Sequence, residues 1–124
     1  RALLEAGLTP VLFTSRGELR CASEQEGRRL SSALAELMGR LASALAPDLG
    51  YLISKGGITT QTLLARGLAL EAVQLEGPLL PGLSLVRPSA GPYSRLPILT
   101  FPGNLGEADT LLEAWQLMQT SGSC

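Results

Sequence analysis

Two glycine-containing segments of the sequence have a composition suited to binding a phosphate group. In each, a short apolar run leads into glycines and a helical pattern follows. The glycines are Gly56 and Gly57 in the first segment and Gly103 and Gly106 in the second. Glycine lets an anion approach the backbone, and the N–H groups at the start of a helix attract negative charge. The same pattern also occurs as a plain tight connection in α/β proteins, so each segment has a binding and a structural interpretation.

Polar residues beside these glycines have the same two interpretations. Lys55 is the single lysine of the chain, and it could pair with a β- or γ-phosphate or be an ordinary exposed lysine. The hydroxyls of Thr59 and Thr60 could cap a helix or reach a phosphate oxygen. Glu107 and Asp109 could serve a magnesium ion or act as a base, or cap the helix that follows. Neither G-x-x-x-x-G-K-[ST] nor G-x-G-x-x-G occurs, so a nucleotide site here would be of another type.

The residue types that are missing or scarce exclude several classes of function. The chain has no histidine, which excludes Ser-His-Asp and Cys-His catalysis and histidine metal sites. Ten basic and eleven acidic residues give a net charge of −1, so we expect neither a nucleic-acid nor a membrane partner. Cys21 and Cys124 are expected to be reduced thiols of a cytoplasmic protein. We assign no catalytic residue and no protein ligand to a metal.

The 124 residues, 45% of them hydrophobic, predict one globular domain. The pattern predicts helices over residues 2–6, 24–46, 59–67 and 109–118, and strands over residues 11–14, 51–54, 72–75, 83–86 and 97–101. Ser23 and Glu26 have the spacing of a capping box at the start of the second helix. We expect the strand over residues 11–14 to be buried. Alternating strands and helices favour an α/β fold, a layered, mainly parallel sheet flanked by helices. The start at Arg1, without methionine, suggests a piece of a longer protein.

Three segments together resemble the C-terminal nucleotide-binding domain of the four-carbon acid sugar kinases. Residues 54–60 contain a G-G-x-T turn, residues 75–82 a G-x-x-x-P-G segment, and residues 99–109 a glycine turn before a helix that starts with acidic residues. The resemblance covers roughly residues 8–118, with the segments in the family's order. That family joins an N-terminal domain that binds a sugar acid to a C-terminal domain that binds ATP. Its substrates are tetronate-type acids such as erythronate, threonate or their 3-oxo derivatives.

The resemblance implies ATP and Mg²⁺ as cofactors and assigns the residues that contact ATP. These are Gly56, Gly57, Ile58 and Thr59 at the first turn and Gly103, Asn104 and Gly106 at the second. It implies a kinase in which the glycine turns and Mg²⁺ hold ATP for in-line attack by a substrate hydroxyl. The sequence departs from the family pattern twice, with Phe101 where a lysine is usual and Leu105 where a phenylalanine is usual.

The resemblance further implies that residues 1–124 are a single truncated nucleotide-binding domain without the N-terminal sugar-acid-binding domain. We expect such a fragment to be inactive alone, with the catalytic base outside it, and to form homo-oligomers through an open sheet edge. One alternative is a degenerate regulatory or assembly domain that kept the fold, which Phe101 favours. Another is that both turns are structural and the likeness is one of fold alone.

Overall fold

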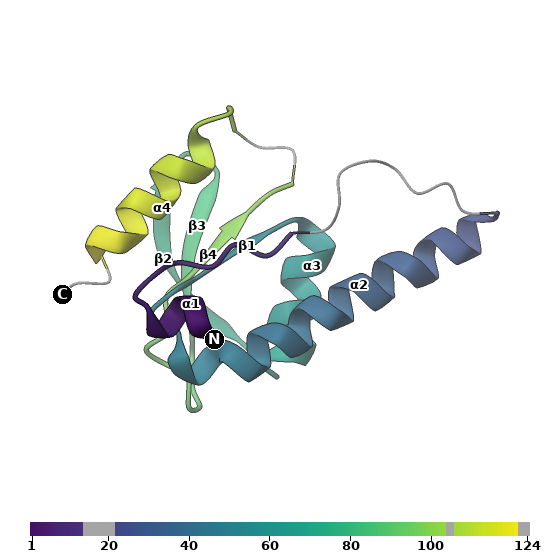
Figure 1. Ribbon diagram of the computed structural model, residues 1–124, viewed down its shortest axis with the longest axis horizontal. Coiled ribbons are helices and arrows are strands. Elements are labelled where there is room, and N and C mark those ends of the chain that lie inside the picture. The colour runs from purple at the N-terminus through teal and green to yellow at the C-terminus, as the bar shows by residue number, and fades with distance from the viewer. Residues whose placement is uncertain (14–21, 104–105, 122–124) are drawn as a thin grey trace.

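The computed structural model describes residues 1–13, 22–103 and 106–121, and it shows one sheet between helices (Figure 1). Helix α4 covers one face, and α2 and α3 cover the other (Figure 1). The elements are α1 (Ala2–Glu5), α2 (Glu24–Leu45), the 3₁₀ turn η1 (Ala46–Asp48), β1 (Leu52–Lys55), α3 (Gly57–Thr62), the π-helical turn η2 (Leu63–Gly67), β2 (Val73–Leu80), β3 (Leu83–Pro88), β4 (Ile98–Phe101) and α4 (Thr110–Ser121). The expected layered α/β architecture is confirmed.

The sheet is mixed, so the expectation of a mainly parallel sheet was wrong. Its four strands lie in the order β1-β4-β3-β2. Strands β1 and β4 pair in parallel, whereas β4 with β3 and β3 with β2 are antiparallel. A parallel neighbour needs a crossover of about a dozen residues or more. Only residues 81–82 join β2 to β3, and residues 89–97 join β3 to β4 without a helix. These short connections therefore give antiparallel neighbours.

The sheet separates two hydrophobic clusters. Strand β4 serves both, because Ile98 lies in the cluster with α2, while Leu99 and Phe101 lie in the cluster with α4. This alternation is the period of two that a strand imposes on its side chains. From α4, Ala114 and Met118 complete the second cluster. A strand with both faces covered is held rigidly, so the carboxyl end of β4 has a fixed position.

Helix α2 begins at the predicted capping box. The Ser23 Oγ accepts a hydrogen bond of 3.2 Å from the Glu26 N–H, and the Glu26 carboxylate accepts one of 3.0 Å from the Ala22 N–H. The early part of α2 extends beyond the sheet (Figure 1), and three of its leucines, Leu30, Leu34 and Leu37, are exposed. Among the described helices, none combines the length and hydropathy that crossing a bilayer requires.

The predicted buried strand over residues 11–14 was wrong for the part that is described. Val11, Leu12 and Phe13 form no strand and are 70%, 62% and 74% exposed; Thr14 lies outside the described residues. The preceding segment is attached through a side chain instead. Thr9 Oγ1 accepts hydrogen bonds from Trp115 Nε1 at 3.0 Å and Gln119 Nε2 at 3.2 Å. The apolar pattern thus belongs to a surface segment rather than to the sheet.

Candidate functional site

The fold brings the two glycine turns together. They follow β1 and β4, which are parallel neighbours with Lys55 opposite Phe101, so both turns lie at the same edge of the sheet. The Gly56 N–H donates a 2.8 Å hydrogen bond to the Phe101 carbonyl. A Cβ placed on Gly103 would lie 3.8 Å from the Gly56 Cα. The backbones of the two turns, which are far apart in the sequence, therefore lie side by side in the structure.

The first turn combines a special glycine conformation with the start of a helix. Gly56 has φ 103° and ψ 139°, and α3 begins at the next residue. In an α-helix the first N–H groups have no acceptor within the helix, which here concerns Gly57, Ile58 and Thr59. A Cβ on Gly57 would meet nothing within 4 Å, and the Ile58 side chain is exposed. The backbone of this turn is therefore open to a ligand from outside.

One threonine of the first turn has a structural role. The Ser54 and Thr60 hydroxyls lie 2.8 Å apart in a hydrogen bond, and Ser54 is only 4% exposed. Thr60 Oγ1 also donates to the Ser54 carbonyl at 3.4 Å. This pairing ties the end of β1 to the first turn of α3. Of the two interpretations of the Thr60 hydroxyl, the structure favours the structural one.

The second turn is described at Gly103 and from Gly106 onward; Asn104 and Leu105 lie outside the described residues. Gly106 has φ 97°, and a Cβ there would come within 2.8 Å of the Thr110 side chain. The Glu107 N–H donates a 2.8 Å hydrogen bond to Thr110 Oγ1 just before α4. Gly106 is therefore needed for its conformation and its small size, whereas a Cβ on Gly103 would have only an ordinary contact, 3.8 Å from the Gly56 Cα.

Lys55 joins the two turns, which the sequence alone did not indicate. Its Nζ donates a 2.8 Å hydrogen bond to the Gly103 carbonyl and lies 4.6 Å from the centre of the Phe101 ring. The Phe101 ring is 3% exposed and belongs to the cluster under α4. A lysine of the first strand thus places its ammonium group at the second turn. Sequence patterns indicated Lys55 only as a neighbour of Gly56, because its contact depends on strand pairing.

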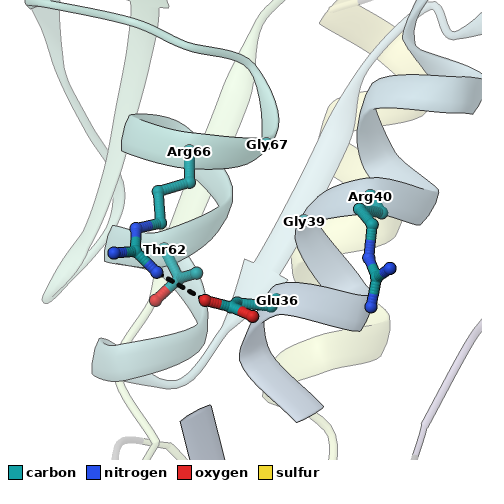
Figure 2. Close-up of a pocket in the computed structure, with 6 residues that line it drawn as sticks. All are labelled: Glu36, Gly39, Arg40, Thr62, Arg66 and Gly67. Carbon is teal, nitrogen blue, oxygen red and sulfur yellow. Dashed lines mark hydrogen bonds and ion pairs between the residues drawn. The ribbon is translucent and has the colours of Figure 1, made fainter. Parts of the chain in front are cut away.

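A shallow cavity of about 310 Å³ lies elsewhere, between α2 and η2 (Figure 2). Arg66 and Glu36 form an ion pair across it, and the Arg40 guanidinium lies apart from that pair (Figure 2). A Cβ on Gly67 would come within 2.5 Å of the Gly39 carbonyl oxygen, so the two helical segments touch through glycines. This cavity contains none of the predicted site residues.

No group of three or more potential metal ligands occurs within residues 1–13, 22–103 and 106–121. Glu107 and Asp109 are exposed carboxylates beside the second turn.

Comparison with known proteins gives a family and a fold. The family profile described as "Nucleotide-binding C-terminal domain" matches residues 1–111. A solved structure of a domain of unknown function from Bordetella bronchiseptica, with bound citrate and as a domain-swapped dimer, superposes with a TM-score of 0.71 at 22% identity. The alignment covers 95% of this chain but 29% of that one, so this chain spans under a third of the neighbour's length. No curated protein matches the sequence. The expected nucleotide-binding C-terminal domain is confirmed.

Proposed function

Because the chain belongs to the family of nucleotide-binding C-terminal domains, we propose that it is the ATP-binding part of a sugar-acid kinase. The substrate in this proposal is a tetronate-type acid such as erythronate, threonate or a 3-oxo-tetronate. The observation that carries the proposal is the meeting of the two glycine turns at the carboxyl ends of β1 and β4. In open α/β sheets this edge is where ligands bind.

The open backbone fits the phosphates of ATP. A Cβ on Gly57 would meet nothing within 4 Å, and one on Gly103 would have only an ordinary contact with the Gly56 Cα, so phosphate oxygens can approach the backbone closely. The N–H groups of Gly57, Ile58 and Thr59 are donors of the kind that phosphate accepts from. In this proposal, Gly103, Asn104 and Gly106 of the second turn form the other side of the ATP-binding site. The role of the chain is to hold and orient the nucleotide.

ATP supplies the phosphoryl group, and Mg²⁺ is proposed as the ion bound to its phosphates. The sugar acid and the base that takes its hydroxyl proton are assigned to a separate N-terminal domain outside residues 1–124, so residues 1–124 alone are proposed to be inactive. Since ATP is the phosphate donor, we place the kinase in the cytoplasm.

The proposal is tested by titrating the full-length protein with ATP and Mg²⁺ in a calorimeter. We expect binding, and we expect Gly103→Ala to weaken it about tenfold or more, since a methyl group would occupy the approach to the backbone. Gly50→Ala is the matched control, because a Cβ at Gly50 likewise fits without overlap, with nothing within 4 Å, but Gly50 lies before β1, away from the turns. Absence of binding to the unmodified protein would overturn the proposal in favour of a non-catalytic domain that kept the fold.

We also propose that the protein forms homo-oligomers. Leu30, Leu34 and Leu37 recur along α2 at helical spacing and are exposed, as are residues 11–13. The Bordetella bronchiseptica domain, which shares the fold, is described as a domain-swapped dimer. Light scattering at increasing concentration tests this, and a constant monomer mass would contradict it.

A further inference from the structure

The ammonium group of Lys55 lies at a junction of three elements. Lys55 ends β1, its Nζ lies over a residue of β4, and its hydrogen bond goes to the second glycine turn. The Gly103 carbonyl that accepts this bond is next to the Gly56 backbone, since a Cβ on Gly103 would be 3.8 Å from the Gly56 Cα. The single lysine of the chain is therefore held where the two turns meet.

This lysine has unused hydrogen-bonding capacity. An ammonium group has three donors, and among the described residues Lys55 Nζ uses one of them, on the Gly103 carbonyl. Four ion pairs occur in the described part of the chain, and none includes Lys55. The side chain is exposed, so an incoming ligand can reach it. A positive charge without an acidic partner, beside open backbone, is the local feature that an anion recognises.

We propose that the Lys55 ammonium group contacts the phosphates at this site, in addition to the backbone N–H groups, and that it ties the second turn to the first when no nucleotide is bound. This inference rests on the proposed function. A phosphate oxygen is a charged acceptor and so a stronger partner than the neutral Gly103 carbonyl. The free donors of Lys55 bind the phosphate, while the ring of Phe101 keeps the ammonium group over the turn. The Lys55 ammonium group thus binds both the nucleotide and the second turn.

The test compares Lys55→Met, Lys55→Arg and Arg40→Met in the full-length protein. Methionine keeps an unbranched chain over the Phe101 ring but removes the charge, and Arg40→Met removes a charge at the distant cavity. Calorimetry gives the affinity for ATP, and displacement of ATP by adenosine gives the affinity for a ligand without phosphates. We expect Lys55→Met to weaken ATP about 10- to 100-fold and to leave adenosine unchanged. Lys55→Arg should recover part of the loss, and Arg40→Met should have no effect.

Two results would overturn this role of Lys55. If Lys55→Met weakens ATP and adenosine by the same factor, the lysine only shapes the turn. If it leaves ATP affinity unchanged while Gly103→Ala still weakens it, the phosphates are held by other groups. In both cases the proposed function stands, whereas failure of the unmodified protein to bind ATP contradicts the proposed function itself.

Discussion

The two glycine turns end at the same edge of the sheet, yet each is stabilised differently. Each contains one glycine with positive φ, Gly56 at 103° and Gly106 at 97°, and one where a Cβ would fit without overlap, Gly57 and Gly103. At Gly56 a Cβ would have ordinary contacts with Thr59, whereas at Gly106 it would overlap with Thr110. The comparison separates glycines that the fold requires from glycines that leave room for a ligand.

The two turns also differ in which residues position them. The first turn is tied within its own strand–turn–helix unit, by the hydrogen bond between Ser54 and Thr60. The second has an internal hydrogen bond too, from the Glu107 N–H to Thr110 Oγ1, but its Gly103 carbonyl also accepts one from Lys55, which belongs to another element. The second turn therefore has a side-chain contact that a ligand can also engage, whereas the Ser54–Thr60 pair of the first turn is internal. Substitutions at the two turns should accordingly separate stability from binding.

The largest expected loss of stability is at Gly106. In Gly106→Ala the new Cβ meets the Thr110 Cβ and Oγ1 at 2.8 Å, and the positive φ adds backbone strain. We expect the free energy of unfolding to fall by about 3 kcal/mol, measured by urea denaturation. Gly103→Ala, in the same turn, is the control and should change it by less than about 0.5 kcal/mol.

Removing the Thr110 side chain sharpens this prediction. The double variant Gly106→Ala/Thr110→Gly removes the Thr110 Cβ as well as its Oγ1 and so relieves the overlap, but it keeps the positive φ and loses the hydrogen bond from the Glu107 N–H. We expect it to lose less stability than the sum of the two single losses, whereas an additive loss would show that crowding at Gly106 is not the cause.

A smaller loss of stability is expected at Gly56, where a Cβ would fit without overlap but the positive φ disfavours any side chain. In Gly56→Ala the closest atom, Thr59 Oγ1, would be 3.7 Å away, so only the positive φ opposes the substitution. We expect a loss of about 2 kcal/mol in the free energy of unfolding. Gly57→Ala is the matched control at the adjacent residue and should leave stability nearly unchanged. Equal losses in both variants would show that the backbone conformation of Gly56 is not what stabilises the first turn.

The elements around both turns could be predicted because each sequence signal there is local. An apolar run, a glycine and a helical period follow one another over residues 51–67 and 97–118, and β1, α3, β4 and α4 form there. The capping box predicted at Ser23 rests on an equally local signal and is confirmed. The proximity of the two turns was not predicted, because it depends on β1 and β4 being parallel neighbours in the sheet.

The errors arose where a pattern needed a distant partner. Residues 11–13 have strand-forming side chains but no strand pairs with them, and Thr9 is held by α4 instead. Strand β2 continues through Gly77 and Pro78 to Leu80, beyond the predicted end at residue 75, because register shifts absorb these residues. The contact of Lys55 with Gly103 was missed for the same reason, since the pairing of β1 with β4 creates it.

The smallest expected effect concerns the hydroxyl pair of the first turn. Ser54→Ala leaves the Thr60 hydroxyl without its 2.8 Å partner in a partly buried place, and we expect a loss of about 1 kcal/mol in the free energy of unfolding. Thr60→Val removes the other hydroxyl at nearly constant shape. If the pair acts as a unit, the double variant loses less than the sum of the two single losses, and urea denaturation of all four proteins measures this coupling. Additive losses would mean that each hydroxyl is satisfied separately, and the first turn would then be held mainly by its backbone hydrogen bond to Phe101.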